Sequence, residues 1–265
     1  MKKGLIEIKA VSHAYATAEG PFPVLSNLDL SVSEGGFAAV VGPSGCGKTT
    51  LTRLIAGLLK PDAGEVWLQG EMVHSPRPTV GMAFQNPVLL EWRSILKNVL
   101  LPLEIVPMLS RAEGEERARH LLELVGLGGF EDKRPSELSG GMRQRASLCR
   151  ALIHQPKVLV LDEPFGALDA FTREDLWQVM HRLRAEEPFT GVLITHDLRE
   201  SVFLAEDVYV LSGRPAHTQF RLRVTLNGPR SIEQLYESEA VKMLAELRHQ
   251  IAIAQGQSAE PDTRH

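Results

Sequence analysis

The string GPSGCGKTT, residues 42–50, constrains the fold of this chain more than any other feature. It fits the pattern G-x-x-x-x-G-K-[ST], in which glycines let backbone N–H groups turn toward a phosphate without a Cβ in the way. Residues 36–41 read as a buried strand, and residues 49–59 read as a helix with apolar residues at helical spacing. A strand, a phosphate loop and a helix in this order predict an α/β nucleotide-binding fold.

The residue types of this loop predict its ligands. Lys48 brings a point charge to the β- and γ-phosphates, and Thr49 offers a hydroxyl oxygen to Mg²⁺. The helix that begins near Lys48 directs the positive end of its dipole at the same anion. A chance glycine turn is the alternative, and the strand and helix on either side argue against it. We therefore expect ATP and Mg²⁺ to bind here, with the cradle formed by Gly42, Pro43, Ser44, Gly45, Cys46, Gly47, Lys48, Thr49 and Thr50.

The run VLVLDE, residues 158–163, is the second informative feature. Four apolar residues followed by two acids predict a buried parallel strand whose carboxyl end meets a ligand. Asp162 is expected to hold Mg²⁺, directly or through water, and Glu163 to orient or deprotonate the attacking water. A solvated acidic turn is the alternative, which the preceding phosphate loop disfavours.

The string LSGGMRQR, residues 138–145, predicts a glycine-rich turn that opens a helix running to about residue 154. Ser139, Gly140 and Gly141 leave backbone donors free at the start of that helix, so we expect a second phosphate site there. The alternative is an ordinary serine N-cap. The full string favours the phosphate site.

With these motifs in place, the chain resembles the ATP-binding subunits of ABC transporters over about residues 4–250, and LSGGMRQR is the diagnostic element. Gln85 fits the glutamine of the Q-loop, Asp169 the D-loop, His196 the switch histidine and Tyr15 the aromatic residue that stacks on adenine. The resemblance implies that Gln85 contacts Mg²⁺ or the lytic water and that His196 contacts the γ-phosphate. The alternatives are a plain strand end, a structural histidine and, for Tyr15, a core aromatic.

The resemblance also implies a mode of action. Two chains pack head to tail, the signature of one covers the ATP in the cradle of the other, and hydrolysis releases the dimer. Asp169 is then expected near the centre of a homodimer. The implied catalytic residues are Glu163, His196 and Gln85, and the implied metal ligands are Thr49, Gln85 and Asp162.

The expected fold is α/β, a P-loop NTPase core of the ABC ATPase type with an antiparallel β part and an inserted helical subdomain. A hairpin is expected at residues 64–73, a charged helix at 111–125, a strand at 220–226 and a helix at 239–254. The expected domains are a core of residues 4–85 and 156–225, a helical signature subdomain of residues 86–155, a C-terminal extension of residues 226–254 and a disordered tail of residues 255–265.

Composition excludes other classes. With 265 residues, 43% hydrophobic residues and a net charge of −4, the chain is an ordinary globular protein without the basic stripe of a nucleic-acid binder. Its two cysteines, Cys46 and Cys149, fit a reducing cytosol. The helix N-terminus is expected to lower the pKa of Cys46 and make the ATPase sensitive to thiol reagents. Neither a signal peptide nor a membrane span is recognisable, so a transport role requires separate membrane subunits.

Three strings, at residues 84–104, 163–173 and 210–215, are similar to importer subunits for nitrate, sulfonate, taurine and related solutes, although Glu91 departs from a frequent proline. This resemblance implies an energy-coupling ATPase. It would lie peripherally on the cytoplasmic face of the inner membrane, with two transmembrane permease subunits and, indirectly, a substrate-binding protein. We expect Leu89, Leu90 and Trp92 to dock a permease helix, unless Trp92 is core. The alternative functions are a soluble non-transport ABC ATPase and a P-loop small-molecule kinase.

Overall fold

The computed structural model describes residues 4–256, which divide into two compact units. Residues 4–75 and 193–256 form the first unit, and residues 76–192 form the second. The sequence predicts a core that includes residues 156–192, whereas this division groups them with the inserted helices, on which they pack. The tail that is predicted to be disordered begins at residue 255, and its residues 257–265 lie outside the described part of the chain.

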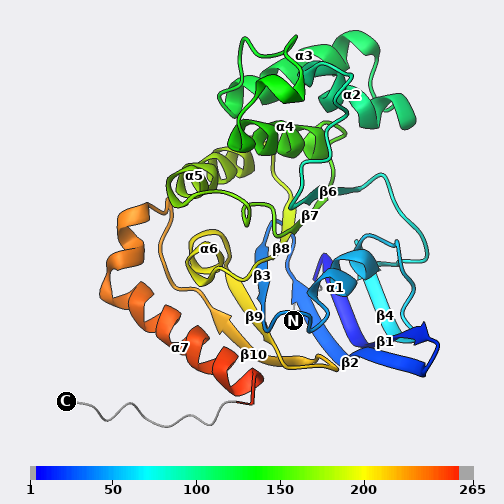
Figure 1. Ribbon diagram of the computed structural model, residues 1–265, viewed down its shortest axis with the longest axis vertical. Coiled ribbons are helices and arrows are strands. Elements are labelled where there is room, and N and C mark those ends of the chain that lie inside the picture. The colour runs from blue at the N-terminus through cyan, green and yellow to red at the C-terminus, as the bar shows by residue number, and fades with distance from the viewer. Residues whose placement is uncertain (1–3, 257–265) are drawn as a thin grey trace. The chain divides into compact units, whose positions relative to one another are not determined.

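The first unit contains an antiparallel sheet in the order β2-β1-β4-β5, shown with its neighbouring elements in Figure 1. Alternate residues are buried along its strands, such as Ile6 and Ile8 on one strand and Val66 and Leu68 on another, as expected for a sheet with one face in the core. The last two strands confirm the hairpin predicted at residues 64–73. The strands are β1 (Ile6–Thr17), β2 (Gly20–Val32), β4 (Ala63–Leu68) and β5 (Glu71–Met72).

A second group of strands in this unit carries the phosphate loop. β3 (Phe37–Val41) is buried throughout, which confirms the strand predicted at residues 36–41. It pairs in parallel with β9 (Asp207–Leu211), and β10 (Thr218–Arg223) pairs antiparallel with β9, slightly earlier than the predicted 220–226. The buried strand β8 (Thr190–Ile194) runs across the boundary between the units.

Helix α1 (Lys48–Ile55) follows the phosphate loop. It buries Leu51, Leu54 and Ile55, three of the four apolar positions on which the predicted helix rests, whereas the fourth, Leu58, lies beyond the helix and is exposed. It ends earlier than the predicted 49–59 because Gly57 adopts a left-handed conformation with φ +73°, which terminates a helix at little cost for glycine.

The C-terminal part of the first unit consists of α6 (Leu198–Leu204), the 3₁₀ helix η2 (Ile232–Tyr236) and α7 (Ser238–Ala254). Helix α7 confirms the prediction at 239–254, and it lies alongside β10 with Ala240, Met243 and Leu247 buried (Figure 1). Arg230 donates to the carbonyl oxygens of residues 202, 203 and 205 at 2.8–3.0 Å. It thereby satisfies carbonyls that the end of α6 leaves without helical partners.

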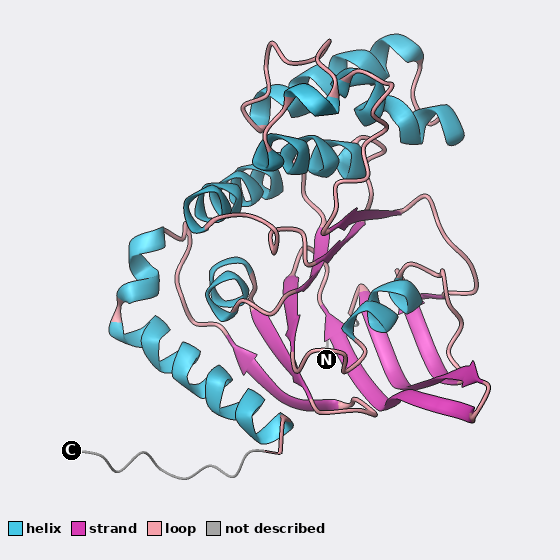
Figure 2. Ribbon diagram, viewed as in Figure 1, coloured by secondary structure: helices cyan, strands magenta, loops and turns pink. Residues whose placement is uncertain are grey.

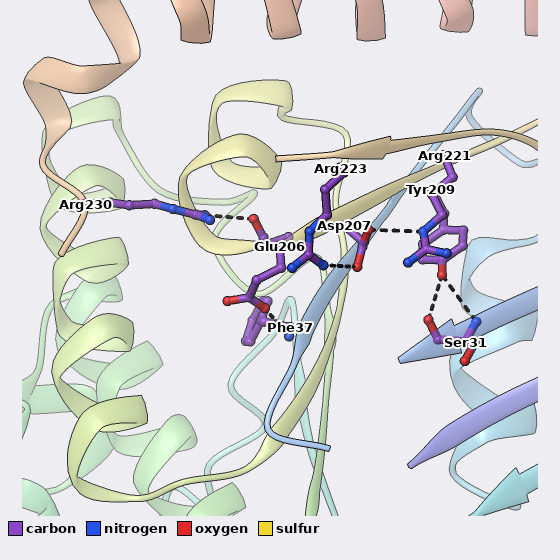
Figure 3. A network of polar contacts seen from close by, with 9 residues as sticks. Ser31, Phe37, Glu206, Asp207, Tyr209, Arg221, Arg223 and Arg230 are labelled. Carbon is purple, nitrogen blue, oxygen red and sulfur yellow. Dashed lines mark hydrogen bonds and ion pairs between the residues drawn. The ribbon is translucent and has the colours of Figure 1, made fainter. Parts of the chain in front are cut away.

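Polar side chains fix the β9–β10 hairpin to its neighbours, as Figure 3 shows. The Tyr209 hydroxyl donates to the Ser31 carbonyl at 2.6 Å and so joins β9 to β2. Asp207 accepts from Arg221 at 3.1 Å and from Arg223 at 2.7 Å, which joins β9 to β10. These contacts therefore fix the two strands from which the β9–β10 loop extends.

The second unit contains two parallel strands and most of the helices in Figure 2. Helix α3 confirms the prediction at 111–125, and Ser110 and Glu113 form a capping box at its start. No described helix is long and apolar enough to cross a bilayer. The elements are β6 (Val80–Phe84), α2 (Ile95–Ile105), α3 (Arg111–Leu124), the 3₁₀ helix η1 (Pro135–Glu137), α4 (Gly140–Leu152), β7 (Val158–Asp162) and α5 (Ala170–Glu186).

Arg117 ties three helices of the second unit together. From α3 it donates to the Leu152 and Ile153 carbonyls at the end of α4, at 3.1 and 2.9 Å. Its Nη1 and Nη2 donate to the two carboxylate oxygens of Glu187 after α5, both at 2.7 Å, and form a two-pronged ion pair. Because both side chains are largely buried, this pair is held against solvent screening.

Candidate nucleotide-binding and catalytic site

The phosphate loop joins β3 to α1 in the first unit. Gly47 has φ +122°, and a Cβ there would lie 2.7 Å from Val24 Cγ1, so only glycine fits. Lys48 is 7% exposed, and its Nζ donates to the Gly42 and Pro43 carbonyls at 3.0 and 2.9 Å. Within residues 4–256, no side chain caps the start of α1, so its first-turn N–H groups are available to an anion.

Cys46 corrects one expectation. Its side chain is 2% exposed, and burial raises the pKa of its thiol even though Lys48 and Arg214 act in the opposite direction. The prediction that the helix N-terminus lowers this pKa is therefore wrong, because loss of solvation outweighs the helix and the nearby cations. Cys149 is also buried, and burial raises its pKa further.

Tyr15 lies on β1, half-buried, and its hydroxyl is 3.2 Å from the Thr50 hydroxyl at the start of α1. Its ring meets the His13 ring edge-on at 5.0 Å between centroids. The structure therefore places this aromatic beside the phosphate loop rather than inside the core.

His196 follows β8 and is exposed. The N–H of Thr195 donates to the Val40 carbonyl on β3 at 3.2 Å, so His196 leaves its strand close to where β3 enters the phosphate loop. Asp197 then caps α6 by accepting from the N–H groups of Arg199 and Glu200. The cap fixes the turn that carries the histidine.

In the second unit, strand pairing brings Gln85 and the acidic pair together. Phe84 of β6 is the parallel partner of Asp162 of β7, so Gln85 and Glu163 are the next residues on the two strands. Glu163 has φ +48°, a conformation that is costly for a residue with a side chain and that is often found at functional sites.

The chain around Gln85 is held by α4, a relationship that sequence reasoning missed. Gln144 donates to the Phe84 carbonyl at 3.0 Å, and Arg150 donates to the Pro87 and Val88 carbonyls at 2.5 and 2.8 Å. Val88 itself has φ +46°, which is rare for a β-branched residue. The helix that begins with the signature thus also positions the segment after β6.

The signature opens α4 as predicted, and Ser139 accepts from the Met142 N–H at 3.3 Å, an ordinary serine cap. Gly141 packs against α5, since a Cβ there would lie 2.5 Å from Thr172 Cγ2. Asp169 in turn accepts from the Thr172 N–H and hydroxyl at 3.1 and 2.7 Å, and these bonds hold the pKa of Asp169 below its usual value. The signature and the D-loop residue therefore share one neighbour.

The expected site residues fall into two groups. The phosphate loop, Tyr15 and His196 lie together in the first unit. The second unit holds Gln85, Asp162, Glu163, Asp169 and the three signature residues. Within each unit, these residues stand at strand ends or helix starts.

A groove of about 750 Å³ lies between α2 and α3 in the second unit, with Trp92 at its edge. Trp92 is 74% exposed, so the alternative that it belongs to the core is wrong. The segment that carries Trp92 is held by Asn98, whose side chain is completely buried. Asn98 accepts from the Leu90 N–H at 2.7 Å. It also donates to the carbonyls of residues 90, 93 and 94 at 3.0–3.2 Å.

These features agree with comparisons to known proteins. The sequence profile of the ABC transporter family matches residues 25–166. The chain belongs to this family. A nitrate import ATP-binding protein of Synechococcus elongatus is 41% identical over 236 residues, covering 88% of this chain and 86% of the relative. A taurine import ATP-binding protein of Pseudomonas syringae pv. tomato is 42% identical over 220 residues, 83% of each chain.

Solved structures agree with the fold of this ABC ATPase. An ATP-binding cassette solved as a dimer in a post-hydrolysis state, bound to ADP and phosphate, superposes with a TM-score of 0.73. It is 29% identical and covers 84% of this chain and 100% of its own. The predictions of an ABC ATPase fold and of an ATP-hydrolysing subunit are confirmed.

Proposed function

We propose that this ABC ATPase is the energy-coupling subunit of an importer for a small solute of the nitrate, sulfonate or taurine class. The observation that carries the proposal is its similarity, along most of its length, to import ATP-binding proteins for nitrate and taurine. The groove at the exposed Trp92 supports a docked partner, because a solvent-open groove with apolar side chains along it, such as Leu100 and Leu103, is typical of an interaction site.

In this proposal the phosphate loop binds ATP through its backbone N–H groups and Lys48, and Tyr15 stacks on adenine. Glu163 orients or deprotonates the attacking water, while Gln85 and His196 contact the water and the γ-phosphate. Oxygens of Thr49, Gln85 and Asp162 are the donor type that Mg²⁺ prefers, and this ion would neutralise charge on the phosphates. The strained backbone of Glu163 supports its assignment.

Two copies would act together. Ser139, Gly140 and Gly141 of one copy would cover the ATP bound by the other, with Asp169 near the centre of the homodimer. The dimeric cassette to which the chain is similar supports this arrangement. Glu163→Gln protein should therefore dimerise only when ATP is present, which light scattering after gel filtration measures. A strictly monomeric variant in saturating ATP counts against a homodimer.

We infer that the groove receives a short helix from each of two transmembrane permease subunits, which places the ATPase on the cytoplasmic face of the membrane. Leu89, Leu90 and Trp92 would dock that helix, together with the exposed Ile105 and Met108 close by in the chain. A substrate-binding protein would act through the permease, and no nucleic acid is expected as a partner.

The test is a pull-down of tagged Glu163→Gln protein from ATP-treated, detergent-solubilised native membranes, with mass spectrometry of the partners. A multi-span permease supports the proposal. The Trp92→Ala, Leu90→Asp double variant should lose the permease and keep ATP binding. Recovery of soluble partners alone favours the soluble, non-transport ABC ATPase.

A further inference from the structure

The guanidinium of Arg214 holds the phosphate loop from outside. Its Nε donates to the Gly45 carbonyl oxygen at 3.1 Å, and its Nη2 donates to the same oxygen. The two residues are 169 positions apart in sequence. We propose that Arg214 is a positioning residue that sets the shape of the phosphate loop for nucleotide phosphates, with Phe22 as its support.

The peptide between Gly45 and Cys46 explains why this contact matters. In a planar trans peptide the carbonyl and the N–H point in opposite directions. Arg214 takes the Gly45 carbonyl, and the Cys46 N–H donates to the Pro43 carbonyl at 3.3 Å. The same peptide is therefore held from both sides. Because Gly45 has φ +72°, a region that glycine enters and leaves freely, its backbone conformation adds little restraint to these two hydrogen bonds.

Phe22 supports the guanidinium. The Arg214 Cζ lies 4.6 Å from the centre of the Phe22 ring, a cation–π contact. Phe22 is the partner of Tyr15 across the β1–β2 ladder, so the two rings extend from the same face. This hairpin thus reaches the phosphate-loop segment twice, at Thr50 through Tyr15 and at Gly45 through Arg214.

The loop that presents Arg214 is itself anchored. Ala216 exchanges backbone hydrogen bonds with β2, donating to Val24 at 2.8 Å and accepting from Ser26 at 2.9 Å. The Gly213 N–H donates to the Ala254 carbonyl in the last turn of α7 at 3.1 Å. The arginine therefore extends from a fixed backbone, and the C-terminal helix is linked to the phosphate loop through it.

The inference rests on the proposal that this loop binds ATP, so the experiment measures both ATP binding by the wild-type protein and the effect of Arg214 on it. Full-length wild-type and variant proteins are titrated with a fluorescent ATP analogue, and pyrophosphate is used as a competitor. Arg214→Ala should weaken binding of both ligands about five- to tenfold, the loss expected for a charge-assisted hydrogen bond and a cation–π contact. In turnover the KM for ATP should rise by a similar factor while kcat changes less than about twofold.

Companion variants separate this role from general stability. Arg214→Lys keeps the charge but loses the two-nitrogen contact and the stacking, so it should restore only part of the affinity. Phe22→Ala should weaken the binding of both ligands about two- to threefold. It should have no further effect in the Arg214→Ala protein, because the ring acts through the arginine. Arg248→Ala removes an exposed charge from α7 and should leave both affinities unchanged.

Wild-type protein that binds no ATP contradicts the proposed function itself. Wild-type protein that binds ATP while Arg214→Ala binds pyrophosphate equally well overturns only the role of Arg214. If Arg214→Ala does not fold, the affinities of Arg214→Lys and Phe22→Ala for pyrophosphate are the test. Unchanged affinity in both variants overturns the inference, and weaker binding in both supports it.

Discussion

Phe84 and Asp162 are partners in the parallel pairing of β6 with β7, so Gln85 and Glu163 leave their strands at the same level. The backbone of Glu163 turns there into the left-handed region, at φ +48°. The carboxylate of Glu163 follows a strained strand end and the amide of Gln85 follows the neighbouring strand, and both types of group can hold a water molecule by hydrogen bonds.

Replacing Glu163 by Gln should therefore lower the ATPase rate by at least about 100-fold, because the amide cannot accept the proton of the attacking water. ATP affinity should remain within about threefold, since Gln keeps the shape of the side chain. Phosphate release and nucleotide titration measure the two quantities. Glu116→Gln, an exposed carboxylate on α3, is the matched control, and a Glu163→Gln rate near that of wild type would exclude the catalytic role.

Tyr15 provides a test of the adenine site. Tyr15→Ala should raise the KM for ATP about tenfold through loss of a stacking surface, whereas Tyr15→Trp should stay close to wild type. Tyr15→Phe loses the contact with the Thr50 hydroxyl but keeps the ring, so its KM should also change little. Equal effects of Ala and Trp would show that stacking is not the role of this residue. Pyrophosphate affinity should be the same in all three variants.

Asn98 organises the segment that carries Trp92. Asn98→Ala leaves the Leu90 N–H and three carbonyl groups without this partner, and should destabilise the protein by about 1–3 kcal/mol. Urea unfolding measures the loss, with the neighbouring exposed Lys97→Ala as control. The variant should also recover less permease in the pull-down while its KM for ATP is unchanged. Full recovery of the permease would show that docking does not depend on the shape of this segment.

The Arg117–Glu187 pair should contribute strongly to stability. Removing the guanidinium in Arg117→Ala takes this partner from Glu187 and from the Ile153 carbonyl, so we expect a loss of about 3–5 kcal/mol in the free energy of unfolding. Glu187→Gln, which removes only the charge, should cost less. Denaturant unfolding of both single variants and the double variant gives the coupling energy, and additive effects would mean that the pair contributes nothing of its own.

Burial predicts that Cys46 is a poor nucleophile. Since the thiolate is the reactive form and the pKa is raised, the thiolate fraction at pH 7–8 is smaller than for a free cysteine. In Cys149→Ala protein, alkylation of Cys46 should be slower than that of a free thiol, and below the pKa its rate should rise about tenfold per pH unit. Mass spectrometry after timed alkylation measures the rate. Fast labelling at neutral pH would contradict the buried environment.

Local sequence patterns were enough for much of the fold. The strand at 37–41, the helices beginning at residues 48, 111 and 238 and the hairpin after Ala63 were all predictable, because each depends on short-range spacing of apolar residues, glycines and caps. The predicted ends of helices were less accurate where one residue terminates the helix, as Gly57 does after α1. The division into units also differs, since packing of residues 156–192 on the inserted helices is a long-range property.

The candidate site shows the same contrast between local and distant effects. The phosphate loop, the acidic strand and the signature are continuous strings, and their chemistry depends on backbone geometry that neighbouring residues impose, so the sequence alone determined them. Only the tertiary structure decided that Cys46 is buried, that Trp92 is exposed, and that Gln144 and Arg150 hold the chain around Gln85. The contact between Arg214 and Gly45 joins residues 169 positions apart, and no spacing pattern encodes such a contact before the strands between them have paired.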